Sequence, residues 1–139
     1  MHTNDTNTHT NYSNKLIYPE LSYKITGLCF SVQGELGRFS REKQYGDLLE
    51  SKLIQNKIPY KRELSVADLG NIIDFLIDDK IVLELKAKKF IYKEDYYQIQ
   101  RYLQHLNIKL GFLINFRNLY LKPVRIVRID TRNRDKFII

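Results

Sequence analysis

The chain has 139 residues, of which 43% are hydrophobic and 28% charged, a composition typical of one folded domain. Charged residues interrupt every apolar stretch, which excludes a membrane-spanning helix of about 20 apolar residues. The single cysteine excludes an internal disulfide, and with only three histidines a zinc cluster of Cys and His is also excluded. The N-terminus has no basic region followed by an apolar run, so we expect no secretory signal and a cytoplasmic protein.

The net charge is +7, from 23 basic and 16 acidic residues. Seven basic and two acidic residues lie between Arg117 and Ile139, so much of the excess is concentrated at the C-terminal end. A concentrated positive field favours a polyanion such as nucleic acid, although many small basic proteins bind none. The charge therefore raises nucleic acid as a partner without establishing it.

Residues 1–14 are predicted to form a disordered tail, and residues 15–139 a single domain. The tail consists largely of Asn, Thr, His and Ser and has no large aliphatic residue after Met1. Such a segment cannot bury enough apolar surface to offset the entropy lost on ordering. No Gly/Ser-rich linker divides the remainder of the chain.

Two amphipathic helices are predicted at the start of the domain. Apolar residues recur at three- and four-residue steps over Leu21–Leu36, and again between Ser40 and Pro59. Ser40 is expected to cap the second helix, because serine is favoured at that position. Three strands are predicted next: Tyr60–Val66, Asn71–Ile77 and Ile81–Lys88.

Helical spacing returns over Tyr92–Leu106. The nearly continuous apolar run Lys109–Phe116 is typical of a buried strand, and the alternating segment Val124–Ile129 predicts an edge strand. The order is therefore α-α-β-β-β-α-β-β. It indicates an α/β (α+β) fold in which helices flank a sheet.

The second and third strands form a predicted hairpin that carries an unusual polar group. With residues 78–80 as the loop, Asp74 lies opposite Glu84 and both side chains point to one face. Lys86 shares that face because side chains alternate along a strand. The opposite face is expected to be apolar, with Ile73, Phe75, Ile77, Ile81, Leu83 and Leu85.

Opposed carboxylates repel each other by up to about 1 kcal/mol on an exposed sheet, and by more where the strands are dry. A divalent cation would reverse this repulsion, since hard cations take carboxylate oxygens as ligands. A neighbouring ammonium could then orient water and offset charge on a phosphate. The alternative is a solvated hairpin face, on which Lys86 joins a weak surface ion cluster.

Three blocks of the sequence resemble, in order, the GxxExxY protein family of the PD-(D/E)XK nuclease superfamily: ELGRFSREKQYGDLLESKL, NIIDFLIDDKIVLELKA and YYQIQRYLQHLNIKLGFLINF. The resemblance covers roughly Leu21 to Ile129. Glu42 and Tyr45 match the ExxY of the family name. Phe39 stands where the motif has its first Gly, so the loop before Glu42 is expected to differ in geometry from that of the family.

The resemblance also covers the nuclease core. Asp74, Glu84 and Lys86 match its acidic and basic positions, and Gln98 with Tyr102 matches a Gln-x-x-x-Tyr-Leu helix. It implies a restriction-endonuclease-like core with a mixed sheet, and phosphodiester hydrolysis with Mg²⁺ or Mn²⁺. The expected substrate is nucleic acid, with DNA favoured.

In that scheme Asp74 and Glu84 bind the metal with the Leu85 carbonyl, and Lys86 positions or activates water. Glu42 would bind the metal or its water; alternatively, it complements the positive end of a helix. Gln98 would orient water or a phosphate; alternatively, it is a solvated polar residue.

Four further residues are candidates for contact with nucleic acid. Tyr45 and Tyr102 could stack on bases, although tyrosines at helical spacing more often fill a core. Arg125 and Arg128 could contact phosphates, or belong to a merely soluble C-terminus. A non-catalytic nucleic-acid-binding or protein-interaction module is the alternative function, and a homodimer or protein partner is left open.

Overall fold

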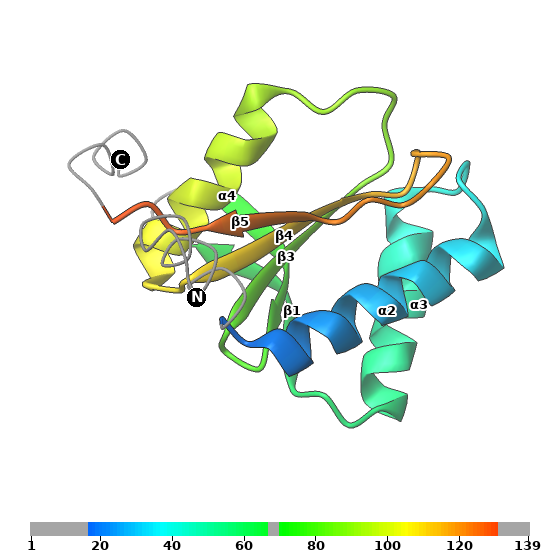
Figure 1. Cartoon of the computed structure of the whole chain (residues 1–139), viewed down its shortest axis with the longest axis horizontal. Coiled ribbons are helices and arrows are strands. Elements are labelled where there is room, and N and C mark those ends of the chain that lie inside the picture. The colour runs from blue at the N-terminus through cyan, green and yellow to red at the C-terminus, as the bar shows by residue number, and fades with distance from the viewer. Residues whose placement is uncertain (1–16, 67–69, 131–139) are drawn as a thin grey trace, which may run out of the picture.

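The computed structural model describes residues 17–66 and 70–130. Their order of elements is the predicted one, with helices α2, α3 and α4 around a five-stranded mixed sheet (Figure 1). The tail predicted for residues 1–14 lies outside the described residues. No helix in the described part of the chain is long and apolar enough to cross a membrane. The elements are α2 (Pro19–Leu36), α3 (Glu42–Gln55), β1 (Tyr60–Val66), β2 (Asn71–Ile77), β3 (Ile81–Lys86), α4 (Lys93–Leu106), β4 (Leu110–Asn115) and β5 (Val124–Val127).

The strands follow one another across the sheet in chain order, β1-β2-β3-β4-β5. Neighbours are antiparallel except β3 and β4, which are parallel because α4 carries the chain back between them. Helices α2 and α3 cover one face of the sheet, and α4 covers the other (Figure 1). Strands β3 and β4 are buried on both faces, which explains their continuous apolar runs.

Several predicted boundaries differ from those of the structure; β5, for example, ends at Val127 and not at the predicted Ile129. Helix α2 begins at Pro19, before the expected Leu21, and β3 ends at Lys86 because the chain leaves the sheet there. Ser40 is not the cap of α3, since its hydroxyl donates a hydrogen bond to the Leu36 carbonyl. Arg41 precedes the helix, and its N–H is taken up by the Gln44 side chain at 2.9 Å.

Ile73 lies on a different face of the sheet from the one predicted. It was expected beside Phe75, but it packs with Leu76 in the cluster under α4, whereas Phe75 packs under α2 and α3. The change of face occurs next to Glu63 of β1, whose φ is 52°. A positive φ interrupts the regular alternation of a strand. Side chains on the two sides of Asp74 therefore point to different helices.

Gly111 allows α4 to lie close to the sheet. A Cβ at this position would come within 2.8 Å of Ile99 Cγ2 and 3.3 Å of the Val82 carbonyl oxygen. We expect Gly111→Ala to lower the free energy of unfolding by about 1–3 kcal/mol through overpacking. Gly27→Ala is the matched control, because the exposed α2 site has open space and a helical alanine adds up to about 1 kcal/mol. The free energy of unfolding is measured in urea. If it changed in the same direction in both variants, the close packing at Gly111 would be contradicted.

Candidate active site

The β2–β3 hairpin has the predicted register, and its strands part at the two predicted carboxylates. The last pair of the ladder is Phe75 with Leu83, which leaves Asp74 and Glu84 as the next opposed residues. Beyond Phe75 and Leu83, hydrogen bonds to side chains take the place of the backbone–backbone hydrogen bonds of the ladder. The Asp74 N–H donates to Glu84 Oε1 at 2.8 Å, and the Leu85 N–H donates to Asp74 Oδ2 at 2.7 Å. The two acids are thus held together by the backbone of each other's strand.

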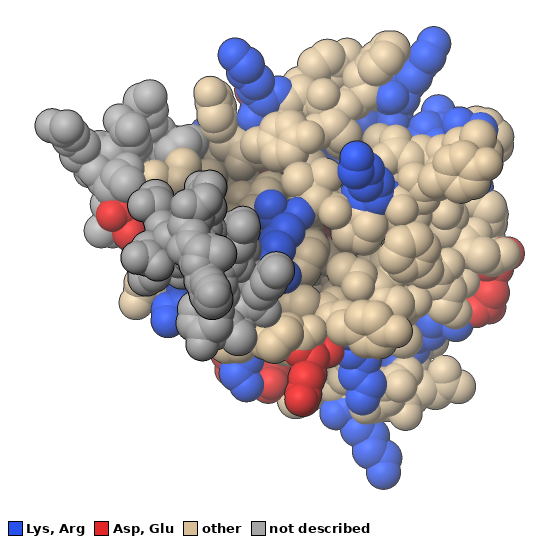
Figure 2. Space-filling view, in the orientation of Figure 1, with Lys and Arg blue, Asp and Glu red and all other residues tan. Residues whose placement is uncertain are grey.

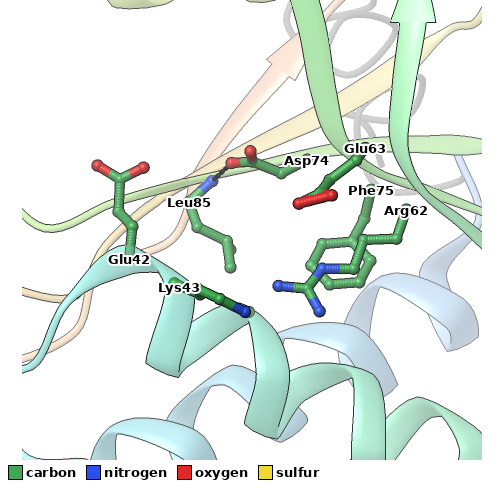
Figure 3. A pocket seen from close by; sticks show the side chains of 8 residues that line it. Glu42, Lys43, Arg62, Glu63, Asp74, Phe75 and Leu85 are labelled. Carbon is green, nitrogen blue, oxygen red and sulfur yellow. Dashed lines mark hydrogen bonds between the residues drawn. The ribbon is translucent and has the colours of Figure 1, made fainter.

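A pocket opens beside this point, between β1, β2, β3 and the start of α3. Figure 3 shows the carboxylates of Glu42 and Asp74 along one side of it, with the Lys43 and Arg62 side chains opposite. Glu42 is exposed there because it is the first residue of α3. The pocket is lined by Glu42, Lys43, Gly46, Arg62, Glu63, Asp74, Phe75 and Leu85.

Burial disfavours the charged forms of both acids, and the charge of a neighbouring carboxylate adds to the effect. Glu84 is 3% exposed, and burial together with the Asp74 charge raises its pKa from 4.5 to about 8. Burial also raises the pKa of Asp74, and the Glu42 charge adds to that rise. Among the described residues, neither acid forms an ion pair. A buried and a half-buried carboxylate without a direct cationic partner form a site that favours added positive charge.

Lys86 lies near a further acid, Asp95, which pairs more closely with Lys88, at 2.8 Å. The Lys86 Nζ is 3.8 Å from Asp95 Oδ1, while its charge lowers the pKa of both Asp74 and Glu84. Asp95 also accepts the Tyr92 N–H at 2.7 Å. Asp95 was not predicted as part of the site. Its only sequence signal is its place in the first turn of α4, where acids commonly bond to free N–H groups.

The donor set suits a hard divalent cation. Magnesium is commonly held by one or two carboxylates and keeps several waters, and Asp74 and Glu84 each accept one hydrogen bond through a single oxygen. Across residues 17–66 and 70–130, no three His, Cys, Asp or Glu side chains gather closely enough to hold a metal ion alone. Glu42 is therefore within electrostatic reach of the pair without completing a cluster of three acids.

Comparison with protein families agrees with this geometry. Residues 19–129 match the family model of the PD-(D/E)XK nuclease superfamily, from the start of α2 to just beyond β5. The chain belongs to the PD-(D/E)XK nuclease superfamily. No curated protein and no solved structure is matched.

In this superfamily member, α4 borders the acidic pair from the other side of the sheet. Tyr102 is 1% exposed, and burial raises the pKa of its hydroxyl, with the charges of Glu84 and Asp74 adding to the rise. Gln98 is half-buried one turn earlier on the same side of α4. It forms no hydrogen bond with the described residues.

The prediction that Tyr45 and Tyr102 stack on bases is wrong. Both rings are buried, and Tyr45 stacks on Phe116 with the ring centroids 4.1 Å apart. The Tyr45 hydroxyl donates to the Gly37 carbonyl at 2.6 Å and so fixes the loop before Glu42. The alternative, in which these tyrosines fill the core, is confirmed.

Arg125 and Arg128 lie on β5 or just beyond it, two strands away from β3. Arg125 packs over the Phe112 ring and donates to the Ile17 carbonyl at 2.8 Å. Arg128 donates to both oxygens of Asp130, at 2.7 and 3.1 Å. The structure does not bring these arginines to the acidic pair, and contact with phosphate remains a prediction.

Proposed function

We propose that this protein is a metal-dependent nuclease that hydrolyses phosphodiester bonds in nucleic acid, with DNA as the expected substrate. The observation that carries the proposal is the Asp74–Glu84 pair at the parting of β2 and β3, in which Glu84 is buried and Asp74 half-buried. Maintaining two such acids without an ion-pair partner destabilises a fold, and binding of a cation offsets this. A module that only bound nucleic acid would need positive charge there instead.

Asp74, Glu84 and the Leu85 carbonyl would hold Mg²⁺ or Mn²⁺, and Glu42 would reach the ion or its water from α3. When bound, the ion would polarise a phosphate oxygen and activate water as a nucleophile. The backbone N–H groups of Asp74 and Leu85 orient the two carboxylates in advance. This preorganisation limits the loss of side-chain entropy on binding.

Lys86 would orient the attacking water and offset charge that develops on the phosphate. Asp95 would act as a positioning residue, because its carboxylate, paired with Lys88 at 2.8 Å, lies 3.8 Å from the Lys86 ammonium on the side of α4. Gln98 would donate to water or to a phosphate oxygen from the same side. The finer assignment to the GxxExxY family is part of the proposal and is supported by Glu42 and by the three matching blocks. A cytoplasmic location, also proposed, suits a chain whose single cysteine is buried.

The test is a cleavage assay with the full chain and end-labelled substrates: single-stranded, duplex and branched DNA, and RNA. We expect at least one substrate to be cut in Mg²⁺ or Mn²⁺ and none in EDTA. If no substrate is cut with either metal, the nuclease proposal fails. Binding without cleavage in that case would identify a non-catalytic nucleic-acid-binding module.

A further inference from the structure

Three loops meet at one end of the sheet, beside the candidate active site. They are residues 37–41 between α2 and α3, residues 87–92 between β3 and α4, and residues 116–123 between β4 and β5. Figure 1 shows them gathered at the upper right. We call them the loop surface. The first loop runs directly into Glu42, and the second begins directly after Lys86.

Hydrogen bonds tie the three loops into one surface. Arg38 Nε donates to the Arg117 carbonyl at 2.9 Å, which joins the first loop to the third. Arg117 Nη2 donates to the Ala87 carbonyl at 3.4 Å, which joins the third loop to the second. The buried Asn115 amide donates to the Lys88 carbonyl at 2.8 Å and accepts its N–H at 3.2 Å. The loops therefore hold their side chains in a fixed arrangement.

Large aromatic rings stand out from this surface. Tyr120 is 84% exposed, Phe39 72%, Tyr92 60% and Phe90 57%. Phe90 and Tyr92 also contact each other, with their ring centroids 6.5 Å apart. Isolated exposed aromatic residues need no explanation, but four of them on three joined loops indicate a binding surface.

Positive charge surrounds these rings. The three loops contain six basic residues and no acidic one. Arg38 and Arg117 lie over the Phe39 ring at 4.9 and 5.3 Å from its centroid, and Lys89 lies 5.5 Å from that of Phe90. Figure 2, in the same orientation, shows Lys and Arg atoms over this upper right part of the molecule.

We propose that the loop surface binds an unpaired strand of nucleic acid and feeds it to the acidic pair. Exposed rings stack on the faces of unpaired bases, and the surrounding cations bind the phosphates. In a duplex those base faces are already stacked on one another, so the rings would have no partner. Six basic residues with no acidic one among them favour a polyanion over a protein partner. The inference rests on the proposed nuclease function, because it names single-stranded nucleic acid as the substrate.

The test is fluorescence anisotropy in EDTA with a labelled oligothymidylate of about 16 nucleotides, the upper end of the usual site size. A matched oligouridylate distinguishes DNA from RNA, and a duplex of the same length tests for strandedness. The variants are Phe39→Ala and Tyr120→Ala. Tyr23→Ala is the matched control, because Tyr23 is 83% exposed on α2, outside the loop surface.

We expect the single strand to bind more tightly than the duplex. Each loop variant should weaken binding by about five- to a hundredfold, the loss of one stacked base, and Tyr23→Ala should leave it unchanged. Equal losses in the loop variants and the control, or tighter duplex binding, would overturn the proposal. Cleavage in Mn²⁺ is measured in parallel. Selective binding without cleavage would reject only the nuclease function, whereas cleavage with unaffected loop variants would reject only the loop surface.

Discussion

Asp74→Asn is expected to abolish metal-dependent cleavage while making the metal-free protein more stable. The amide oxygen of asparagine can still accept the Leu85 N–H that Asp74 Oδ2 accepts at 2.7 Å, so the local fold is retained. The variant lacks one of the two proposed anionic metal ligands, and we expect activity to fall by at least about a hundredfold, as when a key charged group is removed from a catalytic site. Repulsion of Glu84 disappears at the same time.

The matched control is Asp79→Asn, in the turn of the same hairpin. Asp79 has a φ of 54°, which asparagine tolerates, and it pairs with Lys61 on the surface at 3.1 Å. This variant should cut as fast as the wild type. Cleavage rates and urea unfolding in EDTA are measured for all three proteins. Equal cleavage by Asp74→Asn and the wild type would refute the assignment of Asp74.

Glu84→Gln is expected to change how stability depends on pH in the absence of metal. The pKa of Glu84 is about 8 in the folded protein and near 4.5 when unfolded, so the folded state holds an extra proton between these values. The contribution of Glu84 to stability should therefore be greatest below pH 4.5 and should fall as the pH rises towards 8. The limiting slope for one proton is about 1.4 kcal/mol per pH unit.

Glutamine cannot ionise, so the variant should lose this component of the slope and be more stable than the wild type at pH 8. Added Mg²⁺ should raise the stability of the wild type at pH 8 through preferential binding to the folded state, and should affect the variant less. Urea unfolding at pH 5 and pH 8, with EDTA or Mg²⁺, measures both effects. If the free energy of unfolding depended on pH in the same way in both proteins, Glu84 would not be the group that holds an extra proton in the folded state.

The sequence predicted the hairpin well because local rules determine it. The length of the 78–80 turn sets the pairing, so the register that opposes Asp74 to Glu84 follows from counting. The face of Ile73 could not be predicted, because nothing in the sequence marks Glu63 as a residue with positive φ. The predicted alternation of side chains along β2 fails only near Asp74, where β2 and β3 part.

Residues whose role depends on tertiary contacts could not be predicted from the sequence. Asp95 reaches Lys86 only because α4 crosses the sheet between β3 and β4. Spacing alone could not distinguish a buried Tyr45 from an exposed one, since both roles suit an amphipathic helix. The loop surface likewise depends on Arg117, which joins loops distant in the chain.

The most direct test of the central claim is the anomalous scattering of crystals soaked in Mn²⁺. We predict a manganese peak within coordination distance of one carboxylate oxygen of Asp74 and one of Glu84, and no such peak in Asp74→Asn crystals. A manganese ion bound elsewhere, with the Asp74–Glu84 pair empty at saturating metal, would contradict the proposed metal site.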